Sequence, residues 1–235
     1  MTIGTSQRAA GVDGAPRVHS LRPGRLLAAG LLAGPLFAAL VAVQLVAHRD
    51  FDLSRHPISM LATGDHGWVQ VATFAVTGLL VVAASRGVHH RLTAGRGRVW
   101  VPRLIALFGI GLIAAGIFVP DAENGYPAGT PDGPVATMSW HGIAHSASAA
   151  IGYNALIVAM VVFAVRLAIL RRHGWAVANA AVALTLLVLL SLPMADGVSI
   201  RMAFGGVVAF GWLAALCGSL RLGRARRPGE PRHPR

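Results

Sequence analysis

Two histidines at helical spacing, His141 and His145, are the side chains in this sequence best placed to do chemistry. Residues four apart lie on the same face of a helix, which is the spacing that two ligands of one metal ion need. Asp121 follows Pro120 at the end of the preceding apolar run, so antiparallel packing of the two runs would bring its carboxylate to these rings. Zinc accepts such ligands and keeps a position for water when three bind. Asp121, His141 and His145 therefore form a candidate zinc site.

Other interpretations of the same residues remain open. The pattern His-Gly-Ile-Ala-His lacks the glutamate of the His-Glu-x-x-His zinc-protease helix, which argues against that class of enzyme. The polar groups could instead serve the structure, by pairing with each other and satisfying loop backbone and helix ends. A site for a small molecule or a lipid headgroup is the third interpretation. Its candidate ligand-binding residues are His56, Ser59, Asp121, Tyr126, His141 and His145.

The polar segment 50–61, DFDLSRHPISML, lies between two long apolar runs. Pro57 disfavours helical geometry at His56, and Ser59 can bond backbone groups that lack helical partners. Asp65 fits an N-cap for the apolar run that follows. We therefore expect a structured re-entrant or surface loop, packed over the outer mouth of whatever the apolar runs build.

The elements that position these residues are long apolar helices. The mean hydropathy is +0.60 and 13% of the residues are charged, whereas about a quarter are charged in soluble proteins. Apolar runs of about 20 residues cross a bilayer as helices, because lipid leaves backbone groups no other partner. Small residues in several runs predict close helix packing. The predicted spans are 26–47, 68–88, 101–119, 140–169, 175–192 and 202–222.

The predicted fold is thus all-α, a polytopic transmembrane bundle of six helices over residues 26–222. A flexible tail at 1–25 precedes it, because that segment is rich in Gly, Pro, Ser and Arg and poor in large apolar side chains. A basic tail at 223–235 follows. All basic residues except histidine are Arg, and every one except Arg49, Arg55 and Arg201 falls on one side of this bundle. The positive-inside rule predicts that this side, with both termini, is cytoplasmic.

The charge pattern also bears on partners and function. The arginines gather at span ends, where the anionic leaflet attracts them, which argues for membrane lipids as partners and against nucleic acid. No charged residue lies at the centre of a span, which argues against ion-coupled transport. We expect a non-enzymatic plasma-membrane protein that binds a lipid, small ligand or partner at its extracytoplasmic face. A metal-dependent lipid or headgroup hydrolase with zinc as cofactor is the alternative, and a transporter the third; no protein partner is indicated.

Three stretches carry a resemblance to a known family: DLSRHPISMLATGDHGWVQVATFAVTGLL, GIFVPDAENGYP and SWHGIAHSASA. They resemble the bacterial six-helix membrane proteins of the domain of unknown function 998 family. The family features fall here on His56, Pro57, Ile58, Ser59, Asp121, Gly125, Tyr126, Pro127 and His141. The Pro-Ile-Ser element and the histidine that opens a later span are also similar to the DRAM-type membrane family. The resemblance implies a six-span architecture and assigns no activity.

Overall fold

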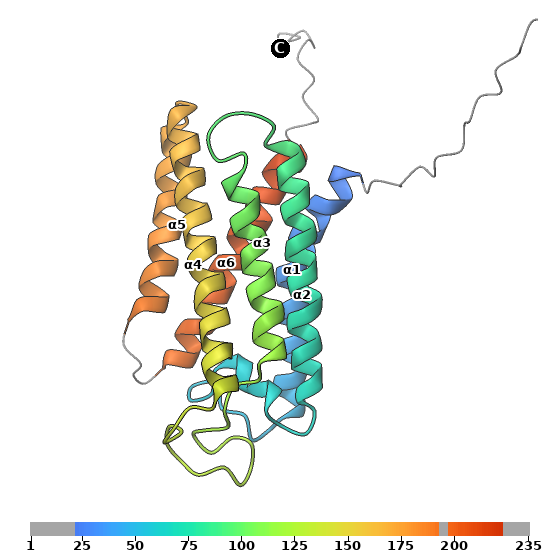
Figure 1. Cartoon of the computed structure of the whole chain (residues 1–235), viewed down its shortest axis with the longest axis vertical. Coiled ribbons are helices and arrows are strands. Elements are labelled where there is room, and N and C mark those ends of the chain that lie inside the picture. Colours follow the sequence, from blue (N-terminus) through green and yellow to red (C-terminus); the bar gives the residue numbers. More distant parts are fainter. Residues whose placement is uncertain (1–21, 193–196, 223–235) are drawn as a thin grey trace, which may run out of the picture.

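The computed structural model describes residues 22–192 and 197–222, so the predictions for the two tails lie almost wholly outside the described residues. Six helices are long and apolar enough to cross a membrane, which confirms the predicted all-α, six-helix fold (Figure 1). In the described ranges the only β pairing is an isolated bridge between Glu123 and Tyr126. The helices are α1 (Pro23–Ala47), α2 (Gly67–Arg91), α3 (Trp100–Ile117), α4 (Trp140–Ile169), α5 (His173–Ser191) and α6 (Val198–Leu222), with a short 3₁₀ helix η1 (Ile58–Ala62).

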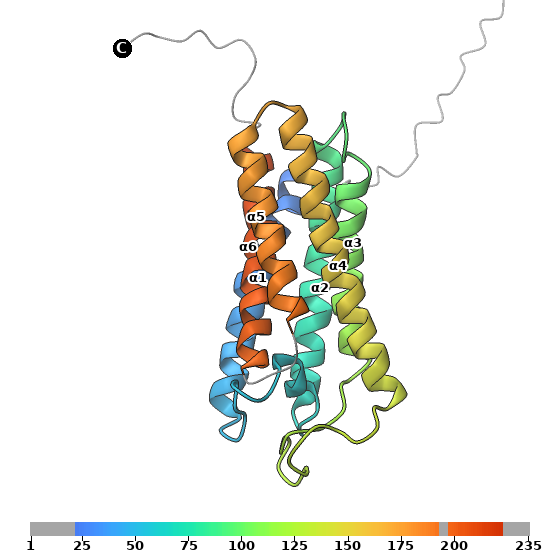
Figure 2. The same ribbon diagram turned by 90° about the vertical axis from the view of Figure 1, so that its left-hand side faces the viewer.

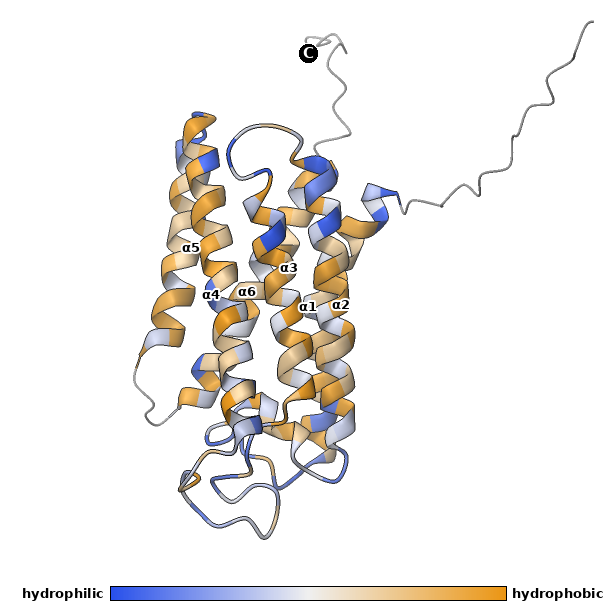
Figure 3. Ribbon diagram, viewed as in Figure 1, coloured by the Kyte–Doolittle hydropathy of each residue, from blue (hydrophilic) through white to orange (hydrophobic). Residues whose placement is uncertain are grey.

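The helices run alternately up and down, and each packs against the next along the chain (Figures 1 and 2). Helix α6 also packs against α1, which closes the bundle. The start of α1 and the end of α6 lie at the same end, which we call the arginine-rich end. The opposite end, here the loop end, carries the long connections 48–66 and 118–139. Apolar residues cover the helices, and hydrophilic residues gather towards both ends (Figure 3).

Glycines let three neighbouring helices approach closely, as the small residues of these spans predict. A Cβ at Gly78 of α2 would lie 2.5 Å from the carbonyl oxygen of Gly109 of α3. One at Gly111 of α3 would lie 2.9 Å from the Cα of Gly152 of α4. In lipid, such close packing replaces the hydrophobic effect as the force that holds helices together. These contacts make α2, α3 and α4 a rigid support for the loops that follow them.

Polar side chains add fixed links between helices inside the bundle. Asn179 of α5 donates its side-chain amide to the carbonyl of Met160 in α4, and its Oδ1 accepts from the indole of Trp212 in α6 at 2.6 Å. All of these groups are buried. An unpaired polar group costs several kcal/mol in hydrocarbon, so this three-helix link also satisfies groups that would otherwise be unpaired.

At the arginine-rich end, Arg166 of α4 holds the connection between α2 and α3. Its Nη1 donates to the carbonyls of Ala94 and Arg96 at 2.7 and 2.8 Å. The intervening Gly95 has φ +80°, and a Cβ there would lie 3.1 Å from Nη1. One arginine of this end therefore orders a loop.

Candidate functional site

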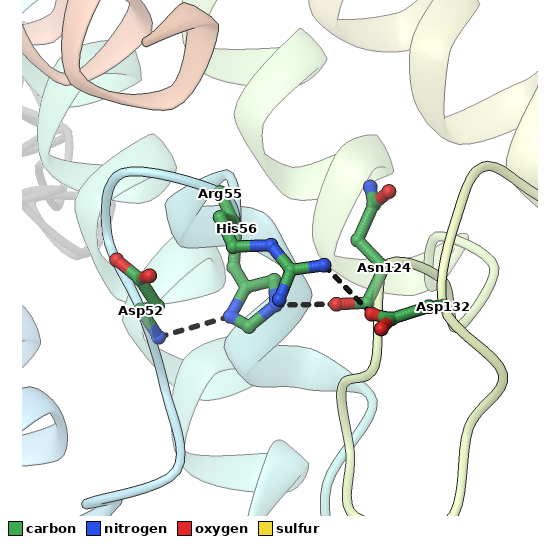
Figure 4. A network of polar contacts seen from close by, with 5 residues as sticks. All are labelled: Asp52, Arg55, His56, Asn124 and Asp132. Carbon is green, nitrogen blue, oxygen red and sulfur yellow. Dashed lines mark hydrogen bonds and ion pairs between the residues drawn. The ribbon is translucent and has the colours of Figure 1, made fainter. Parts of the chain in front are cut away.

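Buried His56 joins the two long connections of the loop end. Its Nδ1 accepts from the backbone N–H of Asp52 at 3.0 Å, and its Nε2 donates to the carbonyl oxygen of Asn124 at 2.9 Å (Figure 4). An amide N–H can only donate and a carbonyl can only accept, so these partners fix a neutral ring with its proton on Nε2. Both ring nitrogens are committed to the loops, and neither is available to a metal ion or a substrate.

The charged residues around His56 are also engaged. Arg55 and Asp132 form an ion pair at 2.7 Å between the two connections, which raises the pKa of Arg55 (Figure 4). The carboxylate of Asp52 accepts from the N–H and the hydroxyl of Ser54 at 2.8 and 2.7 Å, and these bonds lower the pKa of Asp52. Exposed pairs of this kind contribute little stability. The polar segment 50–61 therefore binds the second connection mainly through the hydrogen bond of buried His56, and less through the exposed ion pair.

The second connection folds back on itself so that Tyr126 turns inward. Asn124 and Gly125 have φ values of +56° and +83°, the left-handed geometry that Asn and Gly tolerate best. Their N–H groups donate to the carbonyls of Gly133 and Pro131 at 2.8 and 3.1 Å. The turn buries the side chain of Tyr126, which is 1% exposed.

Asp121, a predicted metal ligand, caps the start of α4. Its Oδ2 accepts from the N–H of Ser139 at 2.9 Å, and Ser139 Oγ accepts from the N–H of Gly142 at 3.1 Å. A Cβ at Gly142 would overlap the Asp121 carboxylate. A negative charge at a helix N-terminus is favourable because the first N–H groups of the helix are unpaired. Asp121 therefore has a structural role in this arrangement.

His145 links α4 to the end of α3. Its Nδ1 lies 2.8 Å from the carbonyl oxygen of Ala115 and 2.9 Å from that of Phe118. Two carbonyls can only accept, so Nδ1 carries the proton and donates to both. The last carbonyls of a helix lack partners within it, and the buried ring of His145 supplies one.

The three predicted zinc ligands are not brought together. His141 is exposed and its ring lies against Trp140, with 3.5 Å between ring centroids, whereas His145 is buried against α3. Within residues 22–192 and 197–222, no three His, Cys, Asp or Glu side chains are arranged to hold a metal ion. Each residue of the expected cluster thus has a different environment, and the geometry gives the zinc hypothesis no ligand set.

The structure also places Asp65 and Ser59, two residues of the connection between α1 and α2. The N-cap of α2 is His66 rather than Asp65, and it makes no side-chain capping bond. Asp65 instead lines a cavity. Ser59 lies in η1, half-buried, and does not line that cavity.

The cavity, which we call the loop-end pocket, has a volume of about 570 Å³ and lies between the end of α1, the start of α2 and the Tyr126 turn. Val43 and Val69 contribute apolar wall. The polar residues that line it are Gln44, His48, Asp50, Asp65, His66 and Tyr126. Tyr126 is the only one of these in the predicted set of six ligand-binding residues.

The hydroxyl of Tyr126 is buried and has no hydrogen-bond partner among the described residues. The Tyr126 ring packs edge-on against Phe51, at 5.0 Å between centroids, and in a tilted contact against His56, at 5.3 Å. Burial raises the pKa of Tyr126, and the charges of Asp50 and Asp65 add to the effect. The side chain is therefore held in place and neutral, and its unpaired hydroxyl belongs to a residue that lines the cavity.

Gln44 supplies a second unsatisfied atom. Its Nε2 donates to the carbonyl of Leu40 at 3.1 Å and to Oε1 of Gln70 at 2.9 Å. A carbonyl must accept, so this contact fixes the orientation of the Gln44 amide and leaves its Oε1 as an acceptor with no partner among the described residues. Sequence reasoning missed Gln44, although it is the one polar side chain within the first apolar run.

Leaving a buried polar atom unpaired costs about 1–3 kcal/mol, so such atoms are rare in folded proteins. Two of them, Tyr126 Oη and Gln44 Oε1, belong to residues that line one pocket. An arrangement of this kind can bind a polar group that completes the missing hydrogen bonds.

Comparison with known proteins agrees with the architecture. No curated protein and no solved structure matches the chain. A family model with the description "Protein of unknown function (DUF998)" matches residues 31–219, which include most of all six helices and both long connections. The family features quoted from the sequence thus lie within the match. This chain is a multi-pass membrane protein that belongs to the DUF998 family.

Proposed function

We propose that this protein binds a membrane lipid through its headgroup in the loop-end pocket, on the extracytoplasmic side of the plasma membrane. The Tyr126 hydroxyl is the observation that carries this proposal, because it is buried and unpaired among the described residues, and Tyr126 lines the pocket. The unpaired Oε1 of Gln44 supports it. A ligand that formed hydrogen bonds to these atoms would remove the free-energy cost of leaving them unpaired.

The position of the pocket favours a lipid. It lies at the last turn of α1 and the first turn of α2, the level at which helices leave the hydrocarbon. Trp68, at the start of α2, is 69% exposed, and an exposed indole at a span end is typical of the headgroup layer. Val43 lines the pocket and is itself 68% exposed, as expected where a cavity meets acyl chains. A headgroup could enter while its chains stay in the bilayer.

The distribution of charge supports the proposed side of the membrane. The described arginines, apart from Arg49, Arg55 and Arg201, lie towards the arginine-rich end, and the positive-inside rule favours the cytoplasm for that end. The loop end and its pocket then face outward. The alternative of a metal-dependent hydrolase loses its support, because His56, Asp121 and His145 bond loop and helix backbone.

A variant that fills the pocket tests this function. Gly64 lines the pocket, and a Cβ there would lie 3.0 Å from the Tyr126 hydroxyl, so Gly64→Val places its branched side chain where the headgroup would lie. Phospholipid retained through detergent exchange is measured as phosphorus per protein. We expect Gly64→Val to lose lipid that the wild type keeps.

The matched control is Gly211→Val, because a Cβ at Gly211 meets nothing within 4 Å and this residue faces outward from α6. It should retain as much lipid as the wild type. If Gly64→Val is folded, with wild-type thermal stability, and retains the same phosphorus as both other proteins, the pocket is not a lipid site.

A further inference from the structure

The loop-end pocket is richer in hydrogen-bond acceptors than in donors. Gln44 Oε1 can only accept, since the amide orientation is fixed by its bond to Leu40. The Tyr126 hydroxyl can accept as well as donate. The carboxylates of Asp50 and Asp65 add four more accepting oxygens. The complementary ligand is one that offers several N–H or O–H donors from a small volume.

The pocket is also lined by two carboxylates, those of Asp50 and Asp65. Among the described residues that line it there is no arginine, and neither Asp50 nor Asp65 forms an ion pair within the described part of the chain. Both carboxylates act on Tyr126, whose pKa they help to raise. Because no arginine lines the pocket and neither carboxylate has an ion-pair partner among the described residues, a cation is favoured beside them over a neutral or anionic group.

Building on the proposed function, we propose that the headgroup bound in the loop-end pocket carries a primary ammonium group, as in phosphatidylethanolamine. In this proposal, the carboxylates of Asp50 and Asp65 balance the charge of the ammonium. Its N–H groups donate hydrogen bonds to Gln44 Oε1 and Tyr126 Oη.

A quaternary ammonium fits the site less well. It has no N–H to donate, so both buried acceptors would stay unpaired when it bound. Sites for choline-like groups surround the cation with several aromatic rings. Here Tyr126 is the one Phe, Tyr or Trp side chain among the described residues that line the pocket. The volume of about 570 Å³ lies within the range of small-ligand pockets, about 300–1,000 Å³.

Lipid competition on the intact protein tests the inference. Detergent-purified protein is exchanged into an equimolar mixture of phosphatidylethanolamine, its N,N-dimethyl derivative, phosphatidylcholine and phosphatidylglycerol with identical acyl chains. Retained lipid is identified by mass spectrometry. We expect phosphatidylethanolamine to be retained roughly tenfold over phosphatidylcholine and phosphatidylglycerol, with the dimethyl lipid between them, because each methyl group removes a donor.

Variants test which residues cause the preference for phosphatidylethanolamine. Tyr126→Phe removes only the hydroxyl and keeps the ring that packs on Phe51 and His56. It should lower the preference several-fold, and the double variant Asp50→Asn, Asp65→Asn should abolish it. Asp132→Asn is the matched control, since this acid lies at the same end but outside the pocket, and it should keep the wild-type preference.

Competition with soluble phosphoethanolamine distinguishes a lipid headgroup from a soluble ligand that carries the same ammonium and phosphate groups. Displacement of the lipid by equal concentrations of phosphoethanolamine would support the ammonium site and assign it to a soluble ligand, whereas no displacement would support the lipid. Equal retention of the four lipids, or a preference for phosphatidylglycerol, would overturn this inference. If that retention still depended on Gly64, the proposed lipid site would stand.

Discussion

His56 and Asn124, 68 residues apart in the chain, are joined by a hydrogen bond of 2.9 Å from the imidazole Nε2 to the backbone carbonyl. This bond ties the connection between α1 and α2 to the connection between α3 and α4. Tyr126 lies two residues beyond Asn124 and packs on the His56 ring. The position of the pocket wall therefore depends on the same histidine that holds the loops together.

Replacing His56 with Ala should loosen both loops. The change leaves the Asn124 carbonyl and the Asp52 N–H without their partner, and we expect the free energy of unfolding to fall by about 1–3 kcal/mol. Hydrogen exchange should accelerate across residues 120–135. Exposed His141 provides the control, because His141→Ala should change the stability by no more than about 0.5 kcal/mol. Equal effects of the two substitutions would contradict the proposed role of His56 in joining the two connections.

Asp121 and Gly142 should behave as a coupled pair. A methyl group at Gly142 must displace the Asp121 carboxylate, so Gly142→Ala should cost about 1–3 kcal/mol. Asp121→Ala alone should cost about 0.5–2 kcal/mol through the lost capping bond to Ser139. With Asp121 already removed, the Gly142 methyl group finds space and costs less. A double-mutant cycle on unfolding free energies measures this coupling, and strictly additive effects would contradict it.

The helices could be predicted from sequence because their signal is local. A run of apolar residues long enough to cross lipid has few alternatives to helix, and the predicted span 140–169 coincides with α4. The ends differ where polar residues extend a helix beyond the apolar run. Helix α2, for example, continues through His89 and His90 to Arg91, because these side chains are favourable in its last turn.

The partners of the histidines could not be predicted in the same way, since they depend on where neighbouring elements end. His141 and His145 do share the spacing of one helix face. However, α3 ends at Ile117, level with His145, so His141 lies a turn further out with no helix beside it. The expected metal cluster assumed that both rings had the same neighbour. Likewise, nothing in the sequence shows that Gln44 faces Gln70 and not lipid.

Tyr126 should ionise only at high pH. The chain has two tyrosines, so Tyr153→Phe leaves Tyr126 as the only phenol to follow by ultraviolet absorbance. Burial and the charges of Asp50 and Asp65 raise its pKa above the ordinary value of 10.0. Stability that depends on the neutral phenol is thus complete below that value and is lost as the pH rises through the raised pKa. Replacing both aspartates with Asn should lower the midpoint, and a midpoint at or below that of free tyrosine would contradict the buried site.

The orientation of the bundle can be tested with single cysteines. Cys217 is buried and is the only cysteine in the chain, so Cys217→Ala gives a background without thiols. Ala122 is exposed at the loop end and Thr93 is exposed at the arginine-rich end. The arginine distribution places the loop end outside, so a membrane-impermeant maleimide should label Ala122→Cys on intact cells.

Thr93→Cys should be labelled only after the cells are permeabilised, which also shows that its thiol is reactive. The loop-end pocket and the outer leaflet then face the same side, as headgroup binding there requires. The reverse pattern, with Thr93→Cys labelled on intact cells and Ala122→Cys protected, would place Tyr126 in the cytoplasm. The lipid would then have to come from the inner leaflet, and the guanidinium groups of this chain would lie on the side that the positive-inside rule disfavours.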